Sequence, residues 1–137
     1  MKKYVNPFSE YFSTQYDASF SDDLKFNIKS FLGRLIYNKK PPNLKTSEKL
    51  LNLGCANRIF SNWVNADFFT IKPWSRINKN KIGINWELDL RYPLNCEDNY
   101  WDGIFMEHVL EHLKAKNAIN LLKELYRTLK PGSHIRI

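Results

Sequence analysis

The chain has 137 residues, of which 43% are hydrophobic and 15% aromatic, a composition that predicts one packed domain and excludes intrinsic disorder. No apolar run approaches the ~18 residues of a membrane-spanning helix, and the N-terminus has no apolar stretch of the kind found in secretory signals. The formal net charge is +7, but the lysines are scattered rather than clustered, so the charge does not favour a nucleic-acid partner over an ordinary basic surface.

The N-terminal third of the chain predicts an arm with one helix. Residues 1–22 are polar and aromatic and show no clear period. Residues 23–38 predict a helix, because apolar side chains recur there at helical spacing. These side chains are Leu24, Ile28, Phe31, Leu32, Leu35 and Ile36. We expect this apolar face to pack against the core; a helix lying on a membrane surface is the alternative.

From Glu48 onward, short apolar runs alternate with turn residues and with one helix. The runs predict β-strands over residues 49–53, 64–68, 84–90, 100–106 and 134–137. Residues 117–129 predict a helix that Lys130-Pro131-Gly132 ends. We therefore divide the chain into an N-terminal helical arm, residues 1–47, and an α/β core, residues 48–137, whose strands form a parallel sheet.

Residues of chemical interest lie at the carboxyl ends of four of the predicted strands. They are Gly54 and Cys55, Asp67, Asp89, and Glu107 with His108. The carboxyl ends of parallel strands share one edge of the sheet, where ligands bind. A small-residue turn lets backbone approach a ligand and a carboxylate accepts hydrogen bonds from a ribose, so the pattern predicts a nucleoside-cofactor pocket.

Gly54 and Asp67 are only 13 positions apart. A nicotinamide dehydrogenase places its acid after about 20 residues, so this spacing argues against that class and predicts a turn or a single helical turn instead of a crossover helix.

Five motifs follow one another in the core. They are Leu51-Asn52-Leu53-Gly54-Cys55-Ala56, Asn62-Trp63-Val64-Asn65-Ala66-Asp67, Leu88-Asp89-Leu90-Arg91-Tyr92-Pro93-Leu94, the stretch Trp101 to Leu113, and the stretch Glu124 to Gly132. In this order, over about residues 48–137, they resemble the class I S-adenosylmethionine (SAM)-dependent methyltransferases of the compact type 11 kind. The resemblance implies an α/β fold with a Rossmann-like parallel sheet that lacks its last strands, because such a fold has seven.

The resemblance also implies a SAM site. The residues that would bind SAM are Gly54, Cys55, Ala56, Asp67, Asp89, Leu90 and Glu107. The Gly-Cys-Ala turn would approach the methionine part of SAM, and Asp67 would accept the ribose hydroxyls. Asp89 would accept the adenine amino group, with Leu90 packing near the ring. In the structural alternative, the two aspartates are turn or cap residues and Cys55 is a small buried residue.

Glu107 and His108 are the catalytic candidates, because the resemblance implies that they line the crevice beside the reactive methyl group. The implied reaction is methyl transfer to a small-molecule acceptor, such as a glycan or a metabolite. The stretch from His108 to His112 also matches the H-x-x-E-H zinc pattern, but its flanks fit the methyltransferase, so we expect no metal. Cys55 and Cys96 form no metal-like cluster and predict a reduced, cytoplasmic setting.

Two departures from the family pattern keep alternatives open. Ala56 and Arg58 stand where many members carry glycines, and the chain ends inside the fifth strand. A fragment of a longer protein, a homo-oligomer through the open sheet edge, and a naturally shortened relative would each explain this end. A non-catalytic binding module on a methyltransferase scaffold is therefore the second functional hypothesis. A nucleic-acid methyltransferase is the third, motivated by the charge alone, because no Asn/Asp-Pro-Pro-aromatic motif is present.

Overall fold

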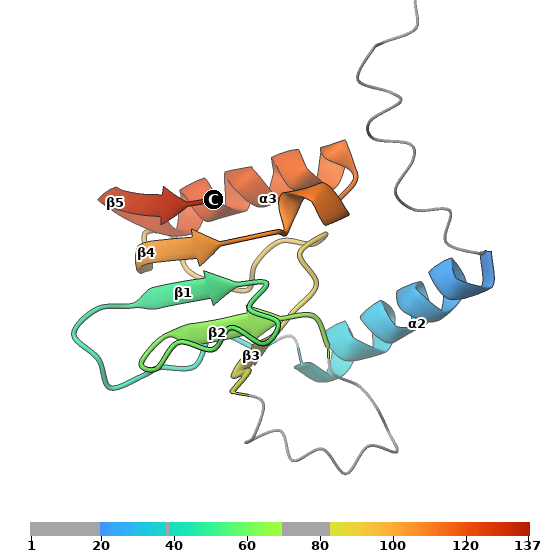
Figure 1. Cartoon of the computed structure of the whole chain (residues 1–137), viewed down its shortest axis with the longest axis horizontal. Coiled ribbons are helices and arrows are strands. Elements are labelled where there is room, and N and C mark those ends of the chain that lie inside the picture. Colours follow the sequence, from blue (N-terminus) through green and yellow to red (C-terminus); the bar gives the residue numbers. More distant parts are fainter. Residues whose placement is uncertain (1–19, 38, 70–82) are drawn as a thin grey trace, which may run out of the picture.

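The computed structural model describes residues 20–37, 39–69 and 83–137 (Figure 1). Within these residues, one helix precedes five strands, and a second helix joins the last two. The elements are α2 (Phe20–Tyr37), β1 (Leu50–Leu53), β2 (Val64–Asp67), β3 (Trp86–Glu87), β4 (Trp101–Met106), the 3-10 helix η2 (Leu110–His112), α3 (Ala115–Thr128) and β5 (Leu129–Arg136). Most of the irregular arm predicted over residues 1–22 lies outside the described residues.

The five strands form one sheet in the order β3-β2-β1-β4-β5, and every neighbouring pair is parallel. This confirms the predicted α/β fold with a Rossmann-like parallel sheet. The chain builds outward from β1 to β3 and then returns to place β4 on the other side of β1. The strand order therefore reverses between β1 and β4, and the carboxyl ends of the strands meet at one edge (Figure 1).

The strand boundaries differ from the prediction at two places. Only Trp86–Glu87 of the predicted strand 84–90 pairs as β3, because the chain turns at Asp89, whose carbonyl accepts from the Tyr92 amide at 3.1 Å. The last strand was expected to begin at residue 134, after a stop at Pro131-Gly132. Instead β5 follows α3 directly, and the register shift between Trp101 and Gly103 absorbs Pro131-Gly132 as a bulge within the strand.

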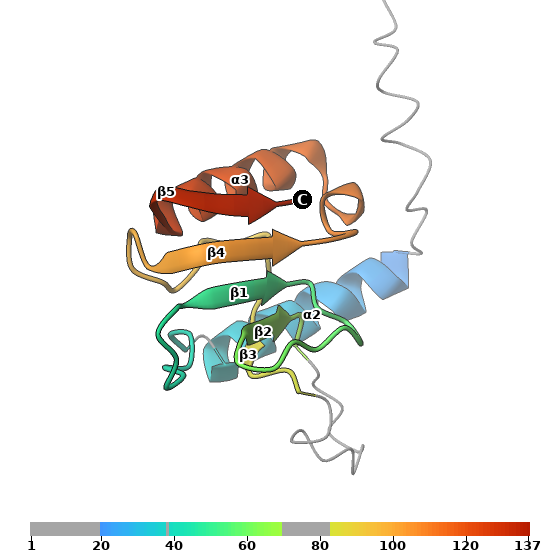
Figure 2. The same cartoon turned by 60° about the vertical axis from the view of Figure 1, so that its left-hand side comes forward.

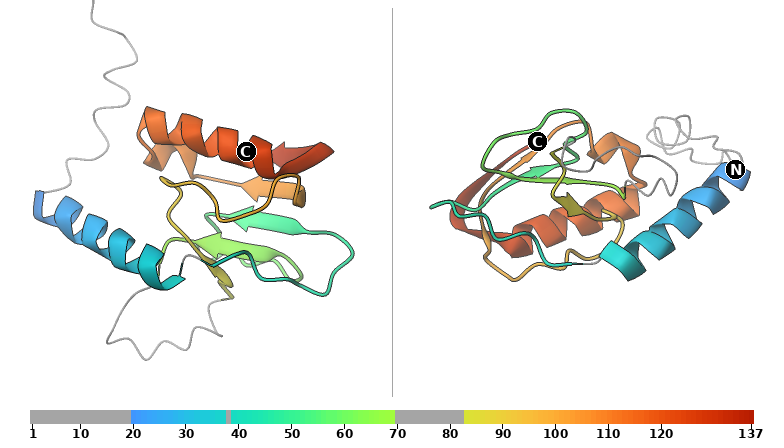
Figure 3. Two further views of the ribbon diagram at one scale, coloured as in Figure 1. Left: turned by 180° about the vertical axis from the view of Figure 1, so that it is seen from behind. Right: turned by 90° about the horizontal axis from the view of Figure 1, so that it is seen from below.

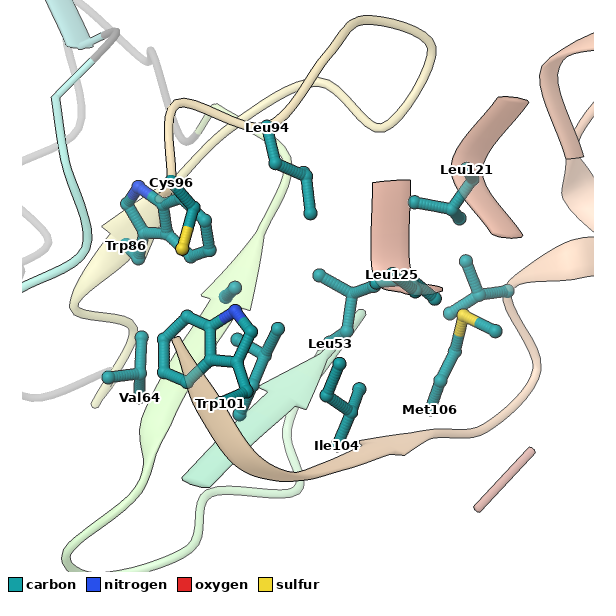
Figure 4. Close-up of a cluster of buried hydrophobic side chains, with 13 residues drawn as sticks. Leu53, Val64, Trp86, Leu94, Cys96, Trp101, Ile104, Met106, Leu121 and Leu125 are labelled. Atoms are coloured by element: carbon teal, nitrogen blue, oxygen red, sulfur yellow. The ribbon is translucent and has the colours of Figure 1, made fainter. Parts of the chain in front are cut away.

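The core fills the face of the sheet that α3 covers (Figure 4). Apolar residues of β1, β2 and β4 point to this face, and Leu121 and Leu125 of α3 pack against them. Trp86 and Trp101 lie with ring centroids 5.9 Å apart, and Trp101 is fully buried, as expected for a core residue. Each such buried side chain contributes about 1.5–3 kcal/mol relative to exposure.

A pair of buried asparagines holds the loop that follows β1. Asn52 and Asn65 lie side by side on neighbouring strands, and the Asn52 amide donates to the Asn65 side chain at 2.9 Å and to the Arg58 carbonyl at 2.6 Å. Asn65 exchanges hydrogen bonds with both backbone groups of Phe60, at 2.9 and 3.0 Å. No helix forms in residues 54–63, as the short spacing predicted, because these side-chain bonds satisfy the loop backbone instead.

The orientation of α2 contradicts the sequence prediction. Its apolar face was expected to pack on the core, but those side chains are exposed. The helix docks through its opposite face, where Ser30 is buried and a Cβ added at Gly33 would lie 2.3 Å from the Phe69 ring. Phe26 stacks on Phe68 at 4.6 Å between centroids. A glycine and a serine allow this close approach, so α2 reaches past the carboxyl ends of the strands near β2 and β3 (Figures 2 and 3).

Among the described residues, no helix is both long enough and apolar enough to cross a bilayer.

Candidate functional site at the carboxyl edge of the sheet

The turn after β1 is held in a left-handed conformation. Gly54 has φ 68° and Ala56 has φ 42°. The amides of Gly54 and Cys55 both donate to the Ala66 carbonyl, at 2.8 and 3.1 Å. A Cβ added at Gly54 would lie 2.3 Å from Val109 Cγ2, so glycine is required for the turn to approach the segment after β4. The turn thus lies at the reversal of strand order, between β2 and β4.

Asp67 joins the end of β2 to this turn. Its Oδ2 accepts from the Ala56 amide at 2.6 Å, and its Oδ1 accepts from the Phe68 amide at 2.6 Å. The two oxygens of a carboxylate offer about four lone-pair sites, so these two amides leave acceptor capacity for a further donor. Two residues that sequence analysis selected from separate motifs are therefore in direct contact.

Cys55 behaves as a structural residue. Its side chain is buried, and its thiol lies 3.9 Å from the Asp67 carboxylate. Burial first, and the Asp67 charge second, raise the pKa of Cys55 to about 12. The thiol is thus protonated at neutral pH and is no nucleophile, in agreement with the interpretation of Cys55 as a small buried residue.

We expect replacement of Ala56 by glycine to stabilise the protein. A residue with a Cβ in the left-handed region costs about 1–2 kcal/mol, and glycine avoids this cost while losing about 0.5–1 kcal/mol in backbone entropy. The free energy of unfolding, measured in urea, should therefore rise by roughly 0.5–1 kcal/mol. Ala118→Gly, in the interior of α3, is the control and should lower it by about 1 kcal/mol. A loss of stability in Ala56→Gly would contradict the strain argument.

Asp89 is buried beneath α2. Its side chain is 3% exposed and accepts from the Ser30 hydroxyl at 2.5 Å and from Arg91 Nη2 at 2.7 Å. Arg91 also donates to Asn27 Oδ1 at 2.9 Å and stacks over the Phe26 ring. The Asp89 carboxylate therefore binds the helix to the sheet edge, and both of its oxygens already have donors.

The pH dependence of stability should report on Asp89. Burial alone would raise the pKa of Asp89, but hydrogen bonds from Arg91 and Ser30 outweigh burial and hold the pKa below its ordinary value. The ionised form therefore stabilises the fold fully above about pH 4, and this contribution is lost as the pH falls through the folded-state pKa. Urea midpoints between about pH 6 and pH 2.5 should fall more steeply for the native protein than for Asp89→Asn. Parallel curves would refute this assignment.

The end of β4 carries two exposed polar residues. Glu107 forms an ion pair with Arg58 from the loop after β1, and both side chains are about half exposed. His108 has φ 54° and a side chain 82% exposed, and its Nδ1 lies 2.9 Å from Glu111 Oε1. In the sequence, Arg58 stands out only because many members of the family carry glycine at this position. Its partner Glu107 is 49 positions away, so the ion pair leaves no local signal.

The residues of the H-x-x-E-H zinc pattern, His108 to His112, do not lie on one α-helix. The only helical residues in the stretch are Leu110–His112, and His108 lies before them in a left-handed conformation. His108 and His112 therefore do not share a helical face. Across residues 20–37, 39–69 and 83–137, no group of three or more His, Cys, Asp or Glu side chains could hold a metal ion.

A cavity of about 260 Å³ lies at the opposite edge of the sheet. Its lining includes Lys49, Tyr100 and Glu97, which precede β1 and β4 in the chain. None of the candidate site residues lines this cavity, so it is separate from the site at the carboxyl edge.

A parallel sheet with this strand order, a left-handed turn after β1 and an acid at the end of β2 define a Rossmann-like α/β domain. Residues 25–137 match the family model described as a methyltransferase domain, so the chain belongs to this family and carries a class I SAM-dependent methyltransferase domain. The match includes most of α2. Searches of curated proteins and of solved structures returned no match.

Proposed function

We propose that this methyltransferase domain binds SAM at the carboxyl edge of its sheet and transfers the methyl group to a small-molecule acceptor, such as a glycan or a metabolite. The observation that supports this most directly is the contact between Asp67 and the Ala56 amide at the reversal of strand order. The residues fit an adenosyl cofactor, because an acid with remaining acceptor capacity lies beside a tight left-handed turn at the reversal of strand order.

In this proposal the turn of Gly54, Cys55 and Ala56 lies along the methionine part of SAM. Asp67 accepts the two ribose hydroxyls in charge-assisted hydrogen bonds. Leu90, half-buried after β3, packs against the adenine ring.

The role of Asp89 in cofactor binding depends on whether Ser30 moves away from its carboxylate. Its oxygens accept from Ser30 and Arg91, so the adenine amino group reaches this carboxylate only when Ser30 withdraws. We propose that α2 shifts on cofactor binding, since α2 supplies both Ser30 and Asn27 to this cluster. The alternative is that Asp89 serves the fold alone and the adenine is held by Leu90 and backbone groups.

His108 is proposed as the general base. Bound SAM supplies an electrophilic methyl group on its sulfonium. When Nδ1–H of His108 donates to Glu111, the Nε2 lone pair is available to take the proton of an acceptor hydroxyl. Glu111 is then a positioning residue that fixes the tautomer of the imidazole. Glu107, paired with Arg58, borders the same edge and contributes a fixed charge rather than a proton.

Calorimetric titration with S-adenosylhomocysteine tests the proposal. We expect saturable heat and a rise in melting temperature. Absence of both at millimolar ligand would favour the second hypothesis, a non-catalytic module on a methyltransferase scaffold, for which the occupied Asp89 and the strained Ala56 are the supporting observations. Transfer of labelled methyl groups to a small-molecule acceptor would exclude that hypothesis.

A further inference from the structure

The outward face of α2 carries an unusual apolar surface. Six large side chains on it are each between 45% and 69% exposed. They are Leu24, Ile28, Phe31, Leu32, Leu35 and Ile36, and we call them the α2 stripe. The stripe lies opposite Ser30 and Gly33, the residues through which α2 docks on its own domain. Contiguous apolar surface of this kind on a folded domain marks an interaction site.

The spacing within the stripe is symmetric. Leu24, Ile28, Phe31 and Leu35 are separated by four, three and four positions, which is the heptad spacing of a helix–helix seam. The same spacing is obtained when the helix is read in the opposite direction. A second copy of α2 laid antiparallel about a two-fold axis would therefore place Leu24 against Leu35 of that copy, and Ile28 against Phe31.

The charges beside the seam agree with this arrangement. In the antiparallel register Lys25 lies beside Leu32 of the second copy, and Asn27 lies beside Arg34, so no like charges face each other. Arg34 is turned toward its own domain, where its guanidinium lies 3.6 Å from the centroid of the Tyr92 ring. A helix that lies on an anionic membrane directs basic side chains outward on its polar flanks, and Arg34 does not do so.

We propose that the chain forms a homodimer through antiparallel packing of the α2 stripe on a second copy of itself. This surface is distinct from the edge strand β5, which offers backbone groups rather than apolar side chains. It does not depend on the cofactor site. The seam extends for about 16 Å along each helix, since Leu24 and Leu35 are eleven positions apart and each step rises about 1.5 Å, so we expect a dimer that dissociates on dilution.

Sedimentation velocity of the full chain over a range of concentrations tests the proposal. The native protein should shift from monomer to dimer as concentration rises. Ile28→Lys should remain monomeric, whereas Ile119→Lys should dimerise like the native protein. Ile28 and Ile119 make a matched pair, because both lie in helices and their exposures are 52% and 53%. Thermal unfolding of both variants shows whether either has lost its fold.

Cysteine cross-linking tests the orientation. Leu24→Cys mixed with Leu35→Cys should give a disulfide between the two variants under mild oxidation, and each variant alone should give far less. The native Cys55 and Cys96 are buried and are the same in every sample.

Several results would overturn the proposal. A native chain that stays monomeric at all concentrations would show that something other than a second copy covers the stripe. A dimer that Ile28→Lys leaves intact would point to the β5 edge. Recruitment of a monomer to anionic phosphatidylserine vesicles, lost in Ile28→Lys, would assign the stripe to a membrane.

Discussion

Replacement of Asp67 by asparagine is expected to weaken the binding of S-adenosylhomocysteine about a hundredfold. The proposed site has one carboxylate to accept two ribose hydroxyls, and a hydrogen bond to a charged group contributes about 1.5–3 kcal/mol. Loss of the charge from both bonds costs about 3 kcal/mol, and each 1.4 kcal/mol is tenfold in affinity. Isothermal titration calorimetry measures the difference directly.

Asp102→Asn is the matched control for this experiment. Asp102 also lies on the sheet and also accepts a backbone amide, from Lys49 at 2.8 Å, but it stands at the opposite edge. Its replacement should leave ligand affinity unchanged. Equal affinities of Asp67→Asn and the native protein would mean that Asp67 only fixes the turn at Ala56. The fall in the melting temperature of Asp67→Asn without ligand, relative to the native protein, would measure this structural contribution of Asp67.

Replacement of Asp89 by alanine is expected to destabilise the protein by about 3 kcal/mol. The change removes the acceptor of one buried donor, Ser30, which is 1% exposed, and of one partly buried donor, Arg91, whose side chain is 22% exposed. Breaking a buried pair by removing one partner leaves the other charge uncompensated, which typically costs 3–5 kcal/mol. Arg91 retains its bond to Asn27, which places the expected cost at the lower end. Urea unfolding at neutral pH measures it.

Glu97→Ala serves as the comparison. Glu97 also accepts from a basic side chain, Lys40 at 2.8 Å, but both side chains are 68% exposed. Solvent screens such a pair, so its removal should leave the urea midpoint unchanged. A similar midpoint for Asp89→Ala and the native protein would contradict the role of Asp89 in docking α2. Increased protease cleavage within α2 of Asp89→Ala would support it.

The order of the elements and the choice of candidate site residues followed from local signals. Apolar runs bounded by Gly54 and Asp67 predicted the ends of β1 and β2, whereas β3 ends at Glu87, two residues before Asp89. The parallel sheet brings these strand ends to one edge. The contact between Asp67 and the turn at Ala56 agrees with the predicted convergence. These features are encoded within a few residues each, and a parallel sheet leaves little freedom in where its strand ends meet.

The partners of these residues did not follow from the sequence. Asp89 binds Ser30 from a helix 59 positions earlier, and Glu107 binds Arg58 from a loop 49 positions earlier. Such pairs depend on how two distant segments dock, and neither segment carries a pattern that specifies the other. The buried state of Asp89 was for the same reason not predicted.

Hydrophobic patterns predicted which segments become helix and strand, and that α2 has an apolar face. Such periodicity shows that an apolar face exists, but it does not specify what the face contacts. The docking of α2 through Ser30 and Gly33, with its apolar face outward, depends on contacts with segments distant in the sequence. The cause is steric, since the helix approaches Phe69 too closely for any side chain at position 33.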